Sequence, residues 1–374
     1  MVNRTDPTSN APIMMLSAGN GFIMQSEKYS RDNAGQSLKK YILLKKGELA
    51  YNHGASKAKQ YGCCYELTED EARIPYVYHC FKVSGAEHTP YVATALNNPK
   101  IDRQLKRLVS SSVRMDGLLN ISFDDYMSVI LHLPSLKEQT HIADFLKKLD
   151  ERITAQEKLV ASLKKHKRGL LRKVFAKLSD SCEKRNLKEV SVLFADGDWI
   201  ESKDQALDGI RLIQTGNVGF GVYIDKTQNA KYISETTFHR LNCLEIYDGD
   251  ILISRLPEPA GRACLLPKST ERRITAVDCT VIRTDSSVID RNYLLQFLCS
   301  EQYLKTVNSF LAGGTRQRIS RKNLEGIEVP YPSIDEQRYW GSFLCRVDAR
   351  ISNEEQRRSS LSRLRCFMLQ QLFI

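Results

Sequence analysis

Two stretches of this chain align with each other without a gap. Residues 134–175 read PSLKEQTHIADFLKKLDERITAQEKLVASLKKHKRGLLRKVF, and residues 332–373 read PSIDEQRYWGSFLCRVDARISNEEQRRSSLSRLRCFMLQQLF. The offset is 198 residues, and 14 of the 42 positions are identical, including Pro134/Pro332, Glu138/Glu336, Gln139/Gln337, Phe145/Phe343, Leu146/Leu344, Asp150/Asp348, Arg152/Arg350, Ile153/Ile351 and Phe175/Phe373. A match of this kind indicates an internal duplication.

Both copies begin with the pattern of a capped helix. Ser135 and Ser333 stand three residues before Glu138 and Glu336, which is the spacing of a capping box. Apolar residues then recur every three or four positions, as in the seam of a coiled coil. They are Ile142, Leu146, Leu149, Ile153, Val160, Leu163, Leu170 and Val174 in the first copy, and Trp340, Leu344, Val347, Ile351, Leu361, Met368 and Leu372 in the second. Polar residues interrupt the seam at Gln156, Lys167, Glu354, Arg358 and Arg365, where they can fix the register.

Each copy predicts a helix of about 39 residues, roughly 58 Å long at 1.5 Å per residue. This is much longer than an average globular helix. We therefore expect the two helices to pair as an antiparallel coiled coil that holds two globular domains apart. The alternative is that each helix packs only on its own domain.

The segments between the helices also repeat, more faintly. Residues 46–49 resemble 248–251, and residues 91–96 resemble 293–298. The sequence predicts an α+β fold with a pseudo-two-fold internal repeat: domains at 1–133 and 181–331, and long helices at 134–180 and 332–374. Within the domains we expect strands at Leu38–Leu44, Tyr76–Val83, Ile251–Ser254 and Ala276–Arg283, and helices at Tyr91–Leu96 and Tyr293–Leu304.

Composition narrows the class of protein. The formal net charge is +11, which favours a polyanionic partner, although many basic proteins have none. No run of 18 apolar residues and no signal pattern at the N-terminus are present, so we expect a cytoplasmic protein without a membrane partner. The ten cysteines form no C-x-x-C pair, which predicts reduced thiols and no zinc site.

The repeated step of an apolar residue, Pro, and Glu-Gln before a long helix resembles the specificity subunit of type I restriction-modification systems. The G-N-x-G turn at 216–219, the K/D-G-D/E step and the segment GGTRQRIS at 313–320 are similar to that family's target-recognition domains. The resemblance covers nearly the whole chain. It implies two target-recognition domains in tandem, each reading one half of a split DNA sequence, with the helices as spacer.

The same resemblance implies the partners. They are double-stranded DNA, two modification methyltransferase subunits docked on the helices, and restriction and motor subunits joined to that core. It implies no catalysis and no cofactor in this chain, because S-adenosylmethionine belongs to the methyltransferase. The first domain departs from the pattern: about a dozen residues precede Ile13, against about 25 from Leu187 to Leu212. We expect it to be completed by the C-terminal end of the chain, to start at a misassigned codon, or to be a truncated copy.

Motifs for chemistry are missing from the sequence. It contains no G-x-x-x-x-G-K-[ST] loop, no Asn/Asp-Pro-Pro-aromatic tetrapeptide and no G-x-G-x-x-G loop. Seven histidines show no metal-ligand spacing, although scattered carboxylates of a metal-dependent nuclease leave no motif. Two alternatives stay open: a coiled-coil scaffold or orphan DNA-binding protein, and a stand-alone nuclease.

Candidate DNA contacts follow from side-chain chemistry, because Arg pairs with guanine edges and Asn or Gln with adenine edges. In the second domain the candidates are Arg316, Arg318, Arg321 and Lys322 beside Gly313-Gly314, then Thr215, Asn217 and Arg255. In the first domain they are Asn52, His53, Lys57 and Lys59 after the Gly47 turn, and Arg114 near the equivalent of Arg316. The run Lys164–Arg168 on the first long helix either touches DNA or is a solvated helix face.

Overall fold

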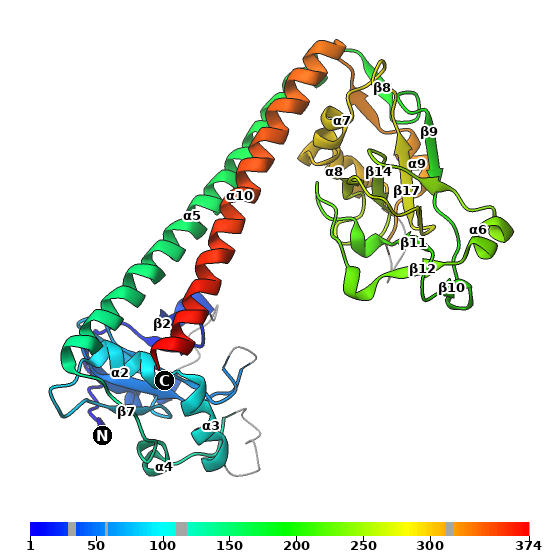
Figure 1. Cartoon of the computed structure of the whole chain (residues 1–374). Coiled ribbons are helices and arrows are strands. Elements are labelled where there is room, and N and C mark those ends of the chain that lie inside the picture. The colour runs from blue at the N-terminus through cyan, green and yellow to red at the C-terminus, as the bar shows by residue number, and fades with distance from the viewer. Residues whose placement is uncertain (29–34, 57–58, 110–117, 312–316, 374) are drawn as a thin grey trace. The chain divides into compact units, whose positions relative to one another are not determined.

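The computed structural model describes residues 1–28, 35–56, 59–109, 118–311 and 317–373 (Figure 1). The chain forms two compact units. Unit 1 comprises Met1–Gln156 and Arg357–Ile374, and unit 2 comprises Glu157–Gln356. The two long helices, α5 (Leu136–Ser181) and α10 (Ile334–Leu372), therefore each contribute one part to unit 1 and one part to unit 2.

Unit 1 has three small antiparallel sheets. Its strands are β1 (Met14–Ser17), β2 (Gly21–Met24), β3 (Ile42–Lys45), β4 (Leu49–Asn52), β5 (Cys63–Glu66), β6 (Glu71–Ile74) and β7 (His79–Phe81), and its short helices are α1 (Gln25–Lys28), the 3-10 helix at Gly35–Lys40, α2 (Thr89–Ala95), α3 (Pro99–Leu108) and α4 (Phe123–Met127). The strand orders are β1-β2, β3-β6 and β5-β4-β7. The central strand β4 packs against helices α2 to α4, and the rings of Tyr51 on β4 and Tyr126 on α4 stack 3.8 Å apart.

Unit 2 is built on two larger sheets. Its strands are β8 (Lys184–Asn186), β9 (Leu193–Asp196), β10 (Gln205–Ala206), β11 (Ile210–Ile213), β12 (Lys231–Ile233), β13 (Glu245–Ile246), β14 (Ile251–Ser254), β15 (Ala263–Leu265), β16 (Arg273–Thr275), β17 (Cys279–Arg283) and β18 (Glu328–Pro330). The five-stranded sheet has the order β10-β12-β11-β16-β13, with β11 and β16 parallel, and the four-stranded antiparallel sheet has the order β15-β14-β17-β9. Strand β18 pairs with β8, directly after α5.

Helices cover the core of unit 2. They are α6 (Glu235–Leu241), α7 (Arg291–Leu298), α8 (Glu301–Ser309), α9 (Arg321–Glu325) and 3-10 turns at Ser202–Asp204, Thr215–Asn217 and Thr227–Asn229. The main core joins β14 and β17 to α7 and to the long helices, and Phe175 of α5 is fully buried against Tyr293 and Phe297 of α7. Burying one such aromatic side chain stabilises a fold by about 1.5–3 kcal/mol.

Within each unit the two long helices lie side by side and antiparallel (Figure 1). In unit 1, Arg365 donates two hydrogen bonds to the carboxylate of Asp150. In unit 2, Lys167 contacts Asp348 at 2.5 Å and Lys164 contacts Glu355 at 2.6 Å. The pairs Asp150–Arg365 and Asp348–Lys167 are related by the same offset of 198 residues, so two of the polar interruptions of the seam are ion pairs repeated by the duplication.

The duplication extends to single hydrogen bonds. Gln139 accepts from the backbone N–H of His88 at 3.0 Å and donates to the carbonyl of Pro134 at 2.9 Å. Gln337 makes the same two bonds to Asp290 and Pro332, at the same distances. Both glutamines are fully buried. Each one fixes the beginning of a long helix to the beginning of α2 or α7.

The aromatic contact at the end of each long helix repeats as well. Phe373 stacks on Tyr91 with ring centroids 5.1 Å apart, as Phe175 packs against Tyr293 at 5.5 Å. The carbonyl of Phe373 accepts a hydrogen bond from Asn98 at 3.0 Å. The C-terminal end of α10 thus packs on the rest of unit 1. At the other end of the chain, the backbone N–H of Val2 donates to the carbonyl of Cys80 in β7 at 2.8 Å.

The expected α+β fold with a repeat and paired long helices is confirmed, while several element boundaries differ. The expected strand at Leu38–Leu44 is a 3-10 helix up to Lys40 followed by β3. The expected helix at Tyr293–Leu304 is two helices, because Ser300 caps the beginning of α8 and breaks the run. The strands expected at Tyr76–Val83 and Ala276–Arg283 are shortened to β7 and β17 by the turns that precede them.

Candidate nucleic-acid interface

Four loops of unit 2 form one surface, which we call the loop face. They are the 3-10 turn Thr215–Asn217 after β11, the loop 255–262 between β14 and β15, the turn 276–278 before β17, and residues 317–322, which end in the first residues of α9. Two arginines, the half-buried Arg262 and the buried Arg255, tie these loops together. Because the loops follow different strands and helix α8, which lie far apart in the sequence, the surface exists only in the folded unit.

Arg262 joins the first loop to the second. Its guanidinium donates to the carbonyls of Val218 at 2.7 Å and Thr215 at 2.9 Å, and to the carbonyls of Leu256 at 2.7 Å and Pro259 at 3.1 Å. Burial lowers the pKa of Arg262 below its usual value. An arginine with this many backbone partners has a structural role, since its donors are occupied within the fold.

Arg255 joins the second loop to the third and fourth. Its guanidinium donates to the carbonyl of Val277 at 2.6 Å and lies 3.4 Å from the carboxylate of Asp196. Its own carbonyl accepts from the backbone of Ile319 at 3.2 Å. Burial lowers the pKa of Arg255, while Asp196 acts in the opposite direction. The side chain is only 3% exposed, so as placed it holds the loop face and does not reach a base edge.

The other described candidates in unit 2 also lie on the loop face. Arg318 is half exposed and 3.8 Å from Asp278. Arg321 and Lys322 begin α9 and are exposed; Arg321 lies 3.2 Å from Glu325, one turn along that helix. Arg316 lies outside the described residues. The structure therefore brings Arg318, Arg321 and Lys322 together as exposed cations.

Asn217 and Thr215 have a different environment from the one the sequence suggests. Asn217 is buried; its amide accepts from the backbone of Gln214 at 3.0 Å and donates to the carbonyl of Ile224 at 2.9 Å. Thr215 is half-buried and contributes its carbonyl to Arg262. As placed, Asn217 shapes the turn, because both ends of its amide have partners in the fold.

In unit 1 the candidates are also largely engaged in the fold. His53 is buried, with its ring nitrogens 2.8 and 3.0 Å from the carbonyls of Leu119 and Val77. Asn52 accepts from the backbone of Gly54, and the ammonium of Lys59 donates to the carbonyl of Asn97 at 2.7 Å. Lys57 and Arg114 lie outside the described residues. Burial of this kind cannot be read from a short polar run.

The basic run on α5 is divided between two roles. Lys164 and Lys167 hold the ion pairs to α10 described above. Lys165, His166 and Arg168 are exposed. Only these three side chains of the run point away from the helix pair.

Sequence reasoning missed a small polar cavity beside the loop face. Its volume is about 170 Å³, and Lys226, Asn229 and Lys231 line it opposite Thr215 and Gly216. The three side chains are exposed. Gly216 leaves room for the Lys226 ammonium, which would lie 2.7 Å from an added Cβ. The signal was present as a run of donor residues after the G-N-x-G turn.

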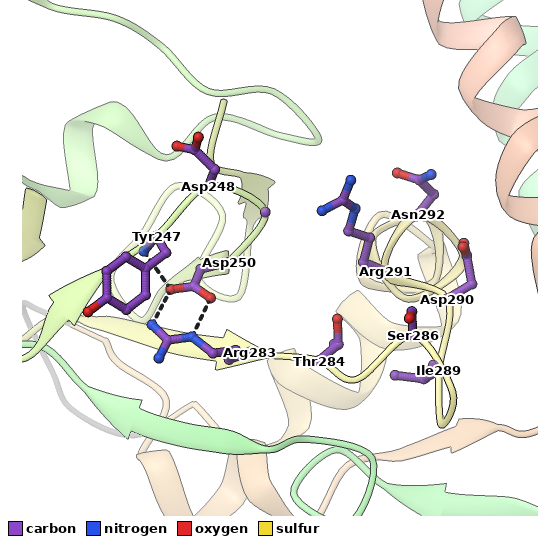
Figure 2. Close-up of a pocket in the computed structure, with 11 residues that line it drawn as sticks. Tyr247, Asp248, Asp250, Arg283, Thr284, Ser286, Ile289, Asp290, Arg291 and Asn292 are labelled. Carbon is purple, nitrogen blue, oxygen red and sulfur yellow. Dashed lines mark hydrogen bonds and ion pairs between the residues drawn. The ribbon is translucent and has the colours of Figure 1, made fainter. Parts of the chain in front are cut away.

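A larger cavity of about 610 Å³ lies between the turn before β14 and the beginning of α7 (Figure 2). Its best-ordered feature is an ion pair: Arg283 binds both oxygens of Asp250 and lies over the ring of Tyr247. Arg291 and Asn292 project from α7 on the other side. No candidate DNA contact lines this cavity, so it is a feature distinct from the loop face.

The described part of the chain contains no group of three or more His, Cys, Asp or Glu side chains arranged to hold a metal ion. Among the described residues, no helix has the length and apolar character needed to span a membrane. The described residues of the loop face offer arginine and lysine donors at the surface. Its geometry suits the binding of a polyanion.

The fold and this surface define a class of protein: a duplicated α+β chain in which each half is built onto a shared pair of long helices. Comparison with known proteins agrees with this description. Residues 180–363 match the family model of the type I restriction modification DNA specificity domain. Residues 180–363 thus carry the DNA specificity domain of the type I restriction-modification family.

Relatives of the chain carry the same description. The type I restriction enzyme MjaVIII specificity subunit of Methanocaldococcus jannaschii is 23% identical over 273 residues, which cover 68% of this chain and 64% of the relative. The putative MjaX specificity subunit of the same organism is 22% identical over 62% of this chain and 55% of its own length. The chain thus spans less than two thirds of the length of these relatives.

Solved structures show the same fold. A chain from work on complex assembly and conformational transition of the type I R-M system matches all of this chain and 94% of its own length, with a TM-score of 0.57 and 18% identity. The type I restriction-modification S subunit from M. genitalium matches 99% of this chain and 90% of its own length, with a TM-score of 0.55 and 16% identity.

Proposed function

We propose that this chain is the DNA specificity subunit of a type I restriction-modification complex, and that each unit reads one half of a split target. The observation that carries the proposal is the repeat of the same contacts, Gln139 with His88 and Gln337 with Asp290, in two units joined to one pair of helices. A protein with two equivalent units suits a target with two parts. The exposed cations of the loop face, Arg318, Arg321 and Lys322, supply phosphate and guanine contacts in unit 2.

The long helices would set the distance between the two half-sites. They would also provide the surface on which two methyltransferase subunits dock, and restriction and motor subunits would join this core. The interhelical ion pairs support this role, because polar seam contacts hold a helix pair in one register.

Catalysis would belong to the partners. In this proposal the chain binds and positions DNA in the cytoplasm, S-adenosylmethionine binds to the methyltransferase subunits, and this chain carries no cofactor. The loop face would fix the register of the duplex by binding the DNA phosphates. The base to be methylated would thereby be presented to the methyltransferase subunit.

The proposal is tested by lengthening both helices. One helical turn of four residues is inserted after Gln156 and a matched turn after Gln356. Both helices are then lengthened equally, which keeps the register of the helix pair. The complex with methyltransferase subunits is then used to methylate genomic DNA. We expect the methylated sites to keep both half-sites and to acquire a longer spacer.

The control carries the same four-residue insertion in the loop around Leu207, which is fully exposed. It should leave the spacer unchanged. A spacer that is unaltered by the helix insertions would reject the spacing role. A chain that binds no duplex DNA would support the scaffold alternative, and cleavage of plasmid by the purified chain with magnesium would support the nuclease alternative.

A further inference from the structure

A short hairpin of unit 2 exposes three large apolar side chains next to the loop face. Residues 218–223 form the hairpin, in which Val218 pairs with Tyr223, and Ile224 follows it directly. Phe220, Val222 and Ile224 are 47%, 58% and 43% exposed. We call these three residues the apolar ridge. Large apolar side chains that gather at one exposed place mark an interaction site more often than isolated ones.

Hydrogen bonds fix the backbone beneath the ridge. Gly219 donates to the carbonyl of Val222 at 2.9 Å, Gly221 donates to Ala263 of β15 at 2.8 Å, and Ile224 donates to Asn217 at 2.8 Å. Arg262 holds the carbonyl of Val218 at 2.7 Å. The hairpin is therefore anchored by Arg262, the same arginine that holds the loop face.

Two glycines make this arrangement sterically feasible. A Cβ on Gly219 would lie 2.6 Å from the carbonyl oxygen of Val222 and 3.0–3.1 Å from the side chains of Val222 and Ile224. The side chains of Val222 and Ile224 thus lie together over Gly219. Gly221 has a φ of +74°, which favours glycine, and a Cβ there would approach the thiol of Cys299. The side chains of the ridge therefore remain exposed to solvent and do not pack into the core.

The surroundings of the ridge are basic. Lys226 and Lys231 line the polar cavity that adjoins Ile224 along the chain, and both are exposed. The neighbouring acid, Asp225, is bound by Arg211 at 2.9 Å, and Arg211 also lies 3.8 Å from Glu271. An apolar group flanked by lysines matches the chemistry of duplex DNA, where stacked apolar bases lie between phosphates.

We propose that the apolar ridge is a wedge that inserts between stacked base pairs at the half-site bound by unit 2. Phe220 and Val222, the most exposed members, would pack against the unstacked bases, while Lys226 and Lys231 bind the adjacent phosphates. Insertion of apolar side chains costs unstacking and is offset by apolar burial and by a duplex bent toward the protein. This inference rests on the proposed function, because it requires that unit 2 binds DNA.

The test uses the full chain and the duplex that it selects from a random pool. 2-Aminopurine, whose fluorescence rises on unstacking, is placed at successive positions of that duplex. The wild-type chain should produce a rise at one base step. The double variant Phe220→Ala/Val222→Ala should abolish the rise and bind about tenfold more weakly, as expected when a buried aromatic contact is lost.

Three controls separate the ridge from its neighbours. Phe367→Ala removes a phenylalanine that is 55% exposed in unit 1 and should leave both readouts unchanged. Lys226→Ala should keep the fluorescence rise and lower the slope of log K against log salt by about one, whereas the ridge variant should keep the slope. Thermal unfolding of the ridge variant should match wild type, since both side chains are exposed.

The outcomes are distinct. If the chain selects no duplex, the proposed function fails and the wedge fails with it. If a duplex is selected and no position brightens, unit 2 binds DNA without a wedge and the inference is overturned. Loss of methyltransferase binding by the ridge variant, with DNA binding and fluorescence intact, would assign the ridge to a protein contact and also overturn the inference.

Discussion

The side chain of Gln337 accepts a hydrogen bond from the backbone N–H of Asp290 at 3.0 Å, and this contact joins the first turn of α10 to the cap of α7. Asp290 in turn caps α7 by accepting from Tyr293 at 2.8 Å. A glutamine is needed because its amide both accepts from Asp290 and donates to Pro332. The repeat of this contact at Gln139 explains why the Glu-Gln step occurs twice in the sequence.

Replacement of this glutamine should destabilise unit 2. Gln337→Ala removes two hydrogen bonds in a fully buried site, which leaves an N–H and a carbonyl without partners and should cost about 2–4 kcal/mol. Both tryptophans, Trp199 and Trp340, lie in unit 2, so urea unfolding followed by tryptophan fluorescence reports on this unit. The exposed Gln370→Ala is the control. Equal midpoints for the two variants would show that the contact is not stabilising.

The two repeated ion pairs should differ in strength. Asp348 binds Lys167 and also accepts from the buried Gln296 at 2.8 Å, whereas Asp150 binds Arg365 at a site where both side chains are more than a third exposed. Asp348→Ala should therefore cost about 1–3 kcal/mol, because it leaves the amide of Gln296 without this partner. Asp150→Ala should cost about 0–1 kcal/mol, as exposed pairs do. Thermal unfolding of both variants provides the comparison, and a larger loss for Asp150→Ala would contradict it.

Loss of arginines next to the loop face should weaken DNA binding through electrostatics. Arg316→Ala combined with Arg318→Ala should lower affinity and flatten its salt dependence by about two units of slope, because each phosphate contact releases counterions. Fluorescence anisotropy with duplex DNA over a salt series measures both quantities. Arg338→Ala, an exposed arginine near the beginning of α10, serves as control. An unchanged slope in the double variant would remove these residues from the interface.

Unit 1 should lose stability on acidification. Burial lowers the pKa of His79, so below about pH 6.5 the unfolded chain takes up a proton more readily than the folded one. Stability is then present above the unfolded pKa and is lost as the pH falls toward the folded pKa. Hydrogen exchange of β4, β5 and β7, corrected for intrinsic rates, follows this unit. His79→Gln, which keeps a donor for the carbonyl of Ile121, should reduce the acid-induced loss.

The architecture could be predicted from the sequence because it depends on local and periodic patterns of residues. The capping box at Ser135 and Glu138 is formed, and Ser333 accepts from the backbone of Glu336 as expected. Strand boundaries were less accessible: residues 38–40 have apolar and polar spacing compatible with a strand, but β6 pairs only with Ile42–Lys45. The ends of β3 are set by its partner strand, which lies about 30 residues away in the sequence. The local pattern of residues carries no information about that strand.

The loop face could be predicted only in part from the sequence. Arg318, Arg321 and Lys322 are exposed as the sequence suggested, yet their contact with DNA stays a prediction. Arg255 has the same chemistry but is buried, because strand β9 and the turn before β17 bring Asp196 and Val277 around it. Residue type indicates which groups can bind a nucleic acid. Which of them remain free depends on contacts between distant strands.

The charged contacts of the long helices have a consequence for alignment. In unit 1 the acid stands on α5 and the base on α10, whereas in unit 2 the acid stands on α10 and the base on α5. If either helix slipped by one turn, Asp150 and Asp348 would both face the wrong residue, and the cost would be incurred at both places. The duplication thus gives the helix pair two ion pairs of opposite orientation. A shift of one helix along the other would break both ion pairs together, so they jointly fix the register of the pair.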